Sequence, residues 1–465
     1  MTRDTRRPGH SRRRFLAAVG VAAVAGCVSS GGSGTGGDGD GDRDSGGTST
    51  ETTGTPTPGS ADGSHPTPSE DPDWDVPVDA PRPDLEVETL VENLEIPWDI
   101  TFTGEGELYM TERTGRVVAF DSGELSEVAR PRKAIDAGAL KPGSDKEPWW
   151  VEGGEGGTLG VAAHPAFPDE EFIYVYYTAA TSGGKENRVV RYDVGADDPA
   201  ATEEVLIEGI PANKYHNGGR VRFGPEGYLW VTTGDAGAPD RAQNRSFLGG
   251  KVLRITPAGD PAPDNPDLGG DPRVFTYGHR NPQGIDWLPS GVPVASEHGP
   301  TKRDEVNVLL PGGNYGWAVA RGGPDDDQWD SYAAHDEFVP PVVNTGPNVG
   351  WAPTGATFYT GEVPTWRNRF VVGGLASQSV WVVTLTPPGR DPPPIEGEAR
   401  RYDTDWLHPA YTATAHRTLQ DELGRVRHVA QSPTGDLYAI TSNRDGRARG
   451  EFPRENDDVL VRLTT

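Results

Sequence analysis

The sequence predicts an all-β protein, a six-bladed β-propeller preceded by a signal segment and a flexible linker. A β-rich run flanked by Gly or Asp turns recurs six times, at Gly106–Val117, Phe172–Thr178, Gly227–Gly237, Gly291–Gly299, Arg369–Leu375 and Gly435–Gly446. The copies lie roughly 55–80 residues apart, which favours one blade per copy with long insertions. No long amphipathic helical pattern separates them, and a pair of β-sandwiches is the alternative architecture.

The charge excludes some classes of partner. The 465 residues include 70 Asp and Glu against 43 Lys and Arg, for a formal net charge of −27. Such a surface disfavours binding to nucleic acid or to an anionic membrane. It fits a halophilic protein, because high salt screens the self-repulsion of the acidic groups. An acidic protein of ordinary salt conditions is the alternative.

Residues 1–27 resemble an export signal. Ser11–Leu16 contains a twin-arginine motif, and the apolar run Leu16–Ala25 is too short for a permanent transmembrane helix. The run leads to Cys27, the only cysteine, in a lipobox-like context. We therefore expect twin-arginine export and a lipid anchor at Cys27 on the outer face of the cytoplasmic membrane. A stray cysteine beside a cleaved signal is the alternative.

The composition of residues 28–80 predicts a flexible tether, and residues 81–465 are expected to form the folded domain. The tether is rich in Gly, Ser, Thr, Asp and Pro and has almost no apolar side chains. Such a segment cannot bury enough surface to offset its chain entropy. Without a cysteine beyond residue 27, the domain has neither a disulfide nor a thiolate metal site.

One candidate site lies just before the third repeat. His216 is followed by Asn217, Gly218 and Gly219, and paired glycines let a ligand approach the backbone. A histidine there is a candidate general base, because its ordinary pKa lies near neutrality. Asp235, at the end of the same repeat, could orient or charge-stabilise that imidazole. The alternative is that both are ordinary turn residues.

Two further polar loops follow. Arg280 and Asn281 lie in Gly278–Gly284, where an arginine could bind a carboxylate or stabilise an oxyanion, or form a rim salt bridge. The turn Glu297–Pro300 precedes Asp304 and Glu305. Its carbonyl groups suit calcium, although an acidic turn without a metal is the alternative.

Arg425 and Arg427 enter the sixth repeat. The alternation of a strand places both side chains on one face. Two cations on one face of so acidic a protein indicate an anionic ligand.

In this order the motifs resemble the soluble PQQ-dependent sugar dehydrogenases of the glucose/sorbosone dehydrogenase family. The resemblance extends from Leu85 to the C-terminus and is carried by IPWD with TERTG, GEGGTLG with HP, HNGGR, TGD, GHRNPQG, EHGP with DEVN, GGNYGW, WAPTG and GRVRHV. Each motif is weak alone, but nine in order are highly specific. The family fold is a six-bladed propeller, in agreement with the repeats.

The resemblance implies a PQQ-dependent aldose sugar dehydrogenase. His216 would remove the proton of the anomeric hydroxyl, with Asp235 in support, while hydride passes from the anomeric carbon to PQQ and an aldonolactone forms. Arg280 and Asn281 would contact the quinone oxygens. The absence of a C-x-x-C-H haem motif implies an external electron acceptor, and a monomer or dimer is expected.

The remaining cofactor contacts follow from the same resemblance. The carbonyl groups of Gly299 and Pro300 would hold calcium, and Arg425 and Arg427 would pair with the cofactor's carboxylates. Two positions depart from the family pattern: Glu155, among the expected PQQ contacts, stands where better-known members have glutamine, and Ala376 stands where they have lysine. Both changes make the pocket less positive for a trianionic cofactor.

Two other functions stay open on the sequence. The departures at Glu155 and Ala376 suit a non-catalytic propeller that binds carbohydrate or protein. A calcium-dependent lactone hydrolase would need several carboxylates converging on the channel, whereas the motifs supply histidine and arginine.

Overall fold

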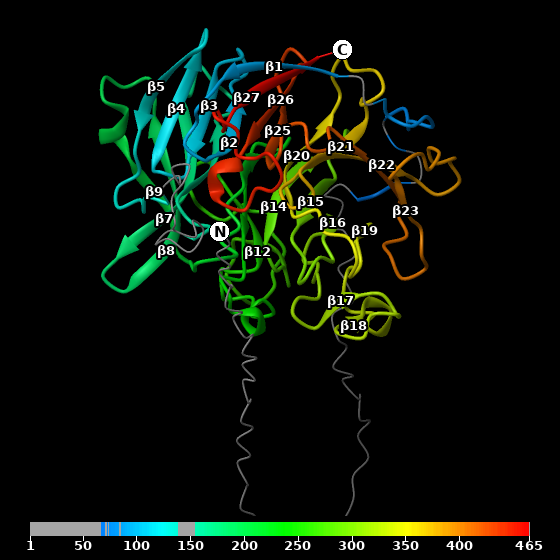
Figure 1. Ribbon diagram of the computed structural model, residues 1–465. Coiled ribbons are helices and arrows are strands. Elements are labelled where there is room, and N and C mark those ends of the chain that lie inside the picture. The colour runs from blue at the N-terminus through cyan, green and yellow to red at the C-terminus, as the bar shows by residue number, and fades with distance from the viewer. Residues whose placement is uncertain (1–66, 70–71, 73, 83–84, 138–153, 465) are drawn as a thin grey trace, which may run out of the picture. The chain divides into compact units, whose positions relative to one another are not determined.

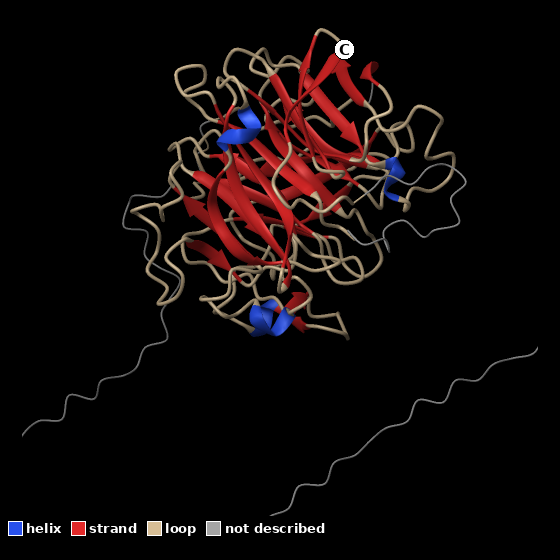
Figure 2. Ribbon diagram, turned by 90° about the vertical axis from the view of Figure 1, so that its left-hand side faces the viewer, coloured by secondary structure: helices blue, strands red, loops and turns tan. Residues whose placement is uncertain are grey.

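The computed structural model describes residues 67–69, 72, 74–82, 85–137 and 154–464. Within these ranges nearly all regular structure is β-strand, and the helices are short 3₁₀ turns (Figure 2). Six antiparallel sheets form the blades of a propeller. The predicted all-β fold and six-bladed arrangement are thus confirmed.

The first three blades follow the chain in order from the inner strand to the outer strand. Blade 1 consists of β2 (Pro97–Phe102), β3 (Leu108–Glu112), β4 (Arg116–Asp121) and β5 (Glu124–Ala129). Blade 2 consists of β6 (Thr158–Ala163), β7 (Phe172–Thr181), β8 (Gly184–Asp193) and β9 (Glu204–Pro211). Blade 3 consists of β10 (Val221–Phe223), β11 (Leu229–Thr233), β12 (Lys251–Ile255) and β13 (Val274–Tyr277).

The other three blades carry the insertions and the closure of the ring. Blade 4 consists of β14 (Pro282–Trp287), β15 (Pro293–Glu297), β16 (Glu305–Val308) and β19 (Val343–Asn344), with the separate pair β17 (Ala320–Gly322) and β18 (Asp330–Ser331) in its insertion. Blade 5 consists of β20 (Pro353–Tyr359), β21 (Arg369–Gly374), β22 (Ser379–Thr386), β24 (Thr412–Thr418) and β23 (Arg400–Tyr402). Blade 6 consists of β25 (Val426–Gln431), β26 (Leu437–Thr441), β27 (Leu460–Thr464) and β1 (Glu86–Val91).

The inner strands close into a ring. β2 contacts both β6 and β25, and β20 contacts both β14 and β25. The first blade therefore packs against the last, which two separate sandwiches would not do.

All six repeated runs of the sequence form the second strand of a blade, namely β3, β7, β11, β15, β21 and β26. β3, β11, β15 and β21 are buried along their whole length. Neighbouring blades cover both faces of such a strand, so its central residues are mostly apolar, whereas the outer strand β5 is largely exposed. The repeats were visible because this burial recurs.

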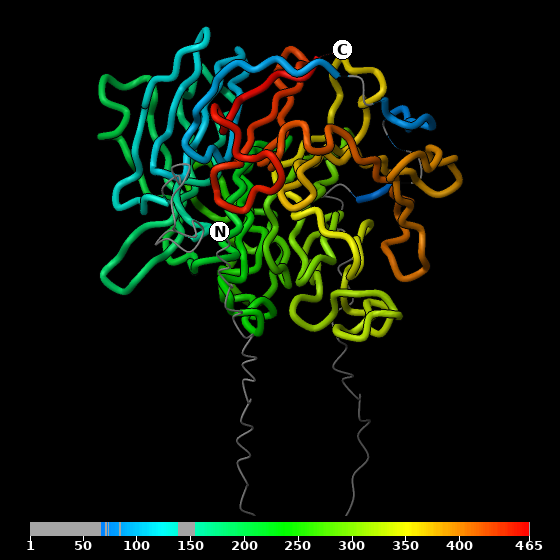
Figure 3. Tube along the Cα trace, viewed as in Figure 1, coloured from blue at the N-terminus to red at the C-terminus, as the bar shows by residue number. Residues whose placement is uncertain are grey.

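The two ends of the domain meet in blade 6. β1 pairs antiparallel with β27, from Glu86 opposite Thr464 to Val91 opposite Leu460. Figures 1 and 3 show this blue strand running beside the red C-terminal strand. Pairing satisfies the backbone groups of β27 and joins the start of the domain to its end.

The last residues of the predicted tether pack against blade 5, so the packed part begins before residue 81. The Trp74 ring is buried, with its centroid 5.7 Å from that of Phe358. Asn368 Nδ2 donates to the Asp75 carbonyl at 2.9 Å, and Trp366 Nε1 donates to the Arg82 carbonyl at 2.8 Å. The Trp74 ring, with Val76 packed against the same core, gives this segment enough apolar area to dock.

The predicted export signal and Cys27 lie outside the described residues and stay predictions. In the described ranges, no helix is long and apolar enough to span a membrane.

Removal of β1 should destabilise the propeller. A protein lacking residues 1–92 should melt about 5 °C or more below one lacking residues 1–84, because only the former leaves β27 as an open edge. Both truncations remove Trp74, so the comparison isolates β1. Thermal unfolding followed by circular dichroism measures the difference, and equal midpoints would show that closure through β1 contributes nothing.

Candidate active site

The candidate residues gather at one end of the inner strands. In each blade the first strand begins where its antiparallel neighbour ends. His216 precedes β10, Asp235 follows β11, and Arg280 and Asn281 precede β14. The ring of blades brings these strand-end loops together around one mouth of the channel.

His216 and Asp235 form a directed pair. His216 Nδ1 lies 2.7 Å from Asp235 Oδ1, and the aspartate side chain is 1% exposed against 16% for the histidine. Asp235 also accepts hydrogen bonds from Gly237 N and Trp317 Nε1, each at 2.8 Å. Because a carboxylate only accepts, Nδ1 carries the proton and Nε2 keeps the lone pair of the neutral ring.

The backbone of His216 is held as firmly as its ring. Its φ is +60°, a conformation that few residues other than glycine adopt. A Cβ atom on Gly234 would lie 2.1 Å from the His216 carbonyl oxygen, so only glycine fits there. The His216 N–H donates to Glu155 Oε2 at 3.1 Å. The Gly-Asp motif thus places both members of the pair.

Glu155 has a cationic partner. Its Oε1 lies 2.9 Å from Arg447 Nη1. Burial alone would raise the pKa of Glu155, but Arg447, His216 and His298 outweigh it and hold that pKa well below its usual range. Arg113 supports the same loop by donating to the carbonyl groups of Gly154 and Gly156. Glu155 is therefore an ionised acceptor that positions His216.

Arg280 and Asn281 are fixed by the blade 4 turn. The Arg280 N–H donates to Glu297 Oε1 at 2.5 Å, and Arg280 Nη1 donates to the His298 carbonyl at 3.2 Å. Asn281 Oδ1 accepts the Gly218 N–H at 3.0 Å, which ties blade 4 to the His216 loop. Burial would raise the pKa of Glu297, but Arg321 and His279 lower it to about 2, so Glu297 stays ionised beneath Arg280.

Several buried donors of this mouth have no partner within the protein. Arg280 Nε, Asn281 Nδ2, His298 Nε2 and Arg425 Nε are each shielded from solvent and lack a hydrogen bond. Buried polar groups nearly always find partners, because leaving one unpaired costs about 1–3 kcal/mol. At this mouth Arg280 Nε, Asn281 Nδ2 and Arg425 Nε are therefore available to bind a ligand rich in oxygen acceptors.

Arg425 and Arg427, predicted to share one strand face and to bind an anionic ligand, meet at one carboxylate of the protein itself. Asp445 Oδ2 lies 2.6 Å from Arg425 Nη2 and 3.6 Å from Arg427 Nη2. Arg427 Nη1 also donates to Gln283 Oε1 at 3.1 Å. The pKa of Arg425 is lowered by burial, although Asp445 opposes the shift. An internal acid therefore already neutralises part of the charge that was expected to await a ligand.

The cations nevertheless outnumber the acids. Arg113, Arg425, Arg427 and Arg447 interact electrostatically with one another and with the two carboxylates Asp445 and Glu155. Four positive groups against two negative ones leave a surplus of positive charge. We call these six residues the arginine cluster. Its surplus favours an anion at the mouth.

The turn at Gly299 and Pro300 is braced by charged side chains. The Gly299 N–H donates to Asp304 Oδ1 at 3.0 Å, and Arg303 Nη1 donates to the Pro300 carbonyl at 3.4 Å. In the ranges that the structure describes, no group of three or more His, Cys, Asp or Glu side chains could hold a metal. Calcium at the two carbonyl groups stays a prediction.

Sequence reasoning missed the partners of the candidate residues. Trp317, Asp445 and Arg447 were not singled out, although Trp317 lies in GGNYGW and the other two lie in or beside the sixth repeat. Asp445 ends a short 3₁₀ helix that begins at Asn443. The only signal for Asp445 and Arg447 was their place in the loop that follows β26, whereas Trp317 lies in the insertion between β16 and β17.

Comparison with known proteins decides the family. The glucose/sorbosone dehydrogenase family matches residues 94–450. This chain belongs to that family. It is 28% identical over 383 residues to the aldose sugar dehydrogenase YliI of Escherichia coli, covering 80% of this chain and 93% of that protein.

Two solved structures extend the likeness. An oxidoreductase of Thermus thermophilus, described as a glucose dehydrogenase, is 36% identical, with a TM-score of 0.63, covering 82% of this chain and 99% of that one. The PQQ-bound aldose sugar dehydrogenase of Streptomyces coelicolor is 29% identical, with a TM-score of 0.62, covering 83% and 99%. Every candidate residue from Glu155 to Arg427 lies inside the segment that matches the family.

Asp445→Asn should destabilise this family member by about 3–5 kcal/mol, because Arg425 and Arg427 would lose a buried counter-charge. Burial would raise the pKa of Asp445, but Arg425, Arg447 and Arg427 hold it far below its usual range. The carboxylate's contribution is therefore complete above the unfolded pKa of about 3.9 and is lost only as pH falls through the folded value. Urea unfolding from pH 8 to pH 3 measures it.

The free energy of unfolding should differ between Asp445→Asn and the wild-type protein by a constant amount from pH 8 to pH 5. This difference should become smaller only in strong acid. Asp391→Asn, in an exposed loop, is the matched control and should change stability little. A difference that already disappears near pH 5 would contradict the pairing.

Proposed function

We propose that the protein is a PQQ-dependent aldose sugar dehydrogenase. It oxidises an aldose at the anomeric carbon to an aldonolactone and passes the electrons to an external acceptor. The observation that carries the proposal is the set of unpaired buried donors at the mouth where the His216 ring, backed by the buried Asp235, is partly open to solvent. The family match and the PQQ-bound relative from Streptomyces coelicolor support it.

The donor set fits PQQ. The cofactor is a planar o-quinone with three carboxylates, so it presents the oxygen acceptors that Arg280 Nε, Asn281 Nδ2 and Arg425 Nε lack. The surplus charge of the arginine cluster suits those carboxylates, and Arg425 and Arg427 would bind them. When bound, PQQ supplies the two-electron acceptor for the hydride of the sugar.

His216 would act as the general base. Its Nδ1 is committed to Asp235, so Nε2 is the atom that takes the proton of the anomeric hydroxyl. The buried Asp235 stabilises the imidazolium that results, as a carboxylate does behind other catalytic histidines. Trp317 and Gly237 keep the Asp235 carboxylate in place, and Glu155 keeps the His216 backbone in place.

Arg280 and Asn281 would hold the quinone oxygens and stabilise negative charge as it develops there. Glu297 supports Arg280 through its backbone N–H, and the Arg280 guanidinium lies 5.5 Å from the centre of the Trp317 ring. These contacts leave Arg280 Nε directed to no protein acceptor.

Calcium is the second proposed cofactor, at the carbonyl groups of Gly299 and Pro300. Carbonyl oxygens are suitable calcium ligands, but two of them do not make a complete site, and Arg303 already donates to Pro300.

The proposed setting is the cell surface. Twin-arginine export, a lipid anchor at Cys27 and adaptation to high salt are proposed from the sequence, as is a monomer or dimer. The electron acceptor is a separate molecule, and PQQ and an aldose are the small-molecule partners.

Reconstitution tests the proposal. The purified protein is mixed with PQQ and calcium in high salt, and aldoses and an artificial dye are added. Sugar-dependent dye reduction is expected. Its absence, with PQQ bound, would leave a non-catalytic binding propeller as the better account.

His216→Ala should lower kcat by about 100- to 10,000-fold, the usual contribution of a general base. PQQ binding should change little, because the unpaired cofactor donors belong to other residues. Steady-state dye reduction gives kcat, and a PQQ titration gives the binding constant. Unchanged kcat would remove His216 from the role of base.

Asp235→Asn should also lower kcat strongly, because an amide can donate to Nδ1 and favour the wrong imidazole tautomer. Steady-state dye reduction measures this loss of kcat, and its dependence on pH should differ from that of His216→Ala. Glu170→Gln, at an exposed turn, is a matched neutralising control and should keep full activity.

A further inference from the structure

The loop after β26 brings a second cation beside Arg425. The Arg449 guanidinium donates to the Ala376 carbonyl, and Arg425 Nη1 donates to the preceding carbonyl, that of Leu375, at 3.1 Å. Consecutive Cα atoms are about 3.8 Å apart, so the two guanidinium groups donate hydrogen bonds to neighbouring peptide units. Arg449 therefore extends the arginine cluster outward to Ala376.

Gln378 fixes the backbone that presents Arg449. Its Oε1 accepts the Arg449 N–H at 2.7 Å, and its Nε2 donates to the Arg449 carbonyl at 3.2 Å. The same Nε2 donates to Asp421 Oδ1 at 3.1 Å. One amide thus binds both polar groups of a single residue, which sets the place from which the guanidinium extends.

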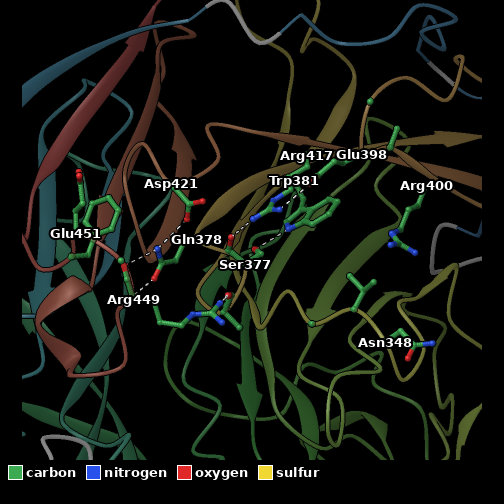
Figure 4. Close-up of a pocket in the computed structure, with 17 residues that line it drawn as sticks. Asn348, Ser377, Gln378, Trp381, Glu398, Arg400, Arg417, Asp421, Arg449 and Glu451 are labelled. Carbon is green, nitrogen blue, oxygen red and sulfur yellow. Dashed lines mark hydrogen bonds and ion pairs between the residues drawn. The ribbon is translucent and has the colours of Figure 1, made fainter.

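Arg449 and Ala376 lie in the wall of an open cavity of about 1020 Å³. Figure 4 shows Arg449 beside Gln378 and Asp421 at one end of it, with Trp381, Arg417 and Arg400 toward the other. Arg449 is exposed, whereas Arg425 is buried. The Arg449 guanidinium is therefore open to a soluble anion at a point where the buried Arg425 is not.

We infer that Arg449 binds a carboxylate of the quinone cofactor and supplies the positive charge that Ala376 lacks. The inference rests on the proposed function. Arg447 and Arg449 lie two residues apart in one loop. Each compensates for one of the two departures from the family pattern that make this pocket less positive. Arg447 neutralises Glu155, and Arg449 places a cation at Ala376.

The Ala376 position explains why the cation must come from another blade. An alanine has no charge of its own, and its carbonyl already accepts from Arg449. The exposed Arg449 guanidinium has further N–H donors beyond that bond, since the group carries five. An arginine can hold a backbone carbonyl and a ligand carboxylate at once, which a lysine does with less directional control.

A titration of the full-length protein with PQQ, followed by tryptophan fluorescence, tests this role without turnover. Arg449→Ala should raise the Kd about 10-fold, the size of a partly exposed charge-assisted contact. Arg454→Ala is the matched control: it removes an exposed arginine of the same loop that lies over Phe452, and the Kd should stay within about twofold.

A charge transplant separates the role from mere loop stability. Ala376→Lys in the Arg449→Ala background should recover most of the lost affinity, whereas Arg449→Gln should not, although it keeps much of the side chain's length. Melting temperatures of all variants show that each is folded.

If the wild-type protein binds PQQ and both Arg449→Ala and Arg449→Gln bind it with the same Kd, the role of Arg449 is wrong while the proposed function stands. Failure of Ala376→Lys to recover affinity would also count against it. Failure of the unchanged protein to bind PQQ would overturn the proposed function and this inference with it.

Discussion

A buried charge cluster at the propeller axis sets the geometry on which the rest depends. Asp99 in β2 contacts Arg220 just before β10 and lies 2.6 Å from His428 in β25. All three side chains are about 1% exposed. An unpaired charge at this depth would cost several kcal/mol, so blades 1, 3 and 6 are stable only where these groups meet. Burial lowers the pKa of His428 to about 4, which keeps it neutral beside Arg220.

Gln283 connects this buried charge cluster to the candidate active site. Arg220 Nε donates to the Gln283 carbonyl at 2.8 Å, while the Gln283 side chain accepts from Arg427 at 3.1 Å. Gln283 follows Arg280 and Asn281 by only a few residues. The axis cluster thus places the first strand of blade 4 and, with it, the donors proposed for the quinone. The His216–Asp235 pair is positioned separately, by Gly234 and by Glu155.

Local pattern predicted the fold and the strand-end residues, because both depend on short stretches of sequence. The second strands are mostly apolar since neighbouring blades cover them, Asp235 directly follows Gly234, and His216 lies two residues before Gly218. Ion-pair partners could not be predicted in that way. Glu155 and Arg447 are 292 residues apart and meet only because the ring of blades brings the loop after β26 to the loop before β6. Trp74 was missed because it lies at the end of a long polar stretch.

The central claim is that His216 takes the proton while bound PQQ accepts the hydride. Rapid mixing of the PQQ-loaded protein with an aldose, without dye or oxygen, measures it most directly, because the absorbance of the bound cofactor reports a single turnover. The account predicts sugar-dependent reduction in the unchanged protein and a rate lower by about 100-fold or more in PQQ-loaded His216→Ala. Equal rates in the two proteins would contradict it.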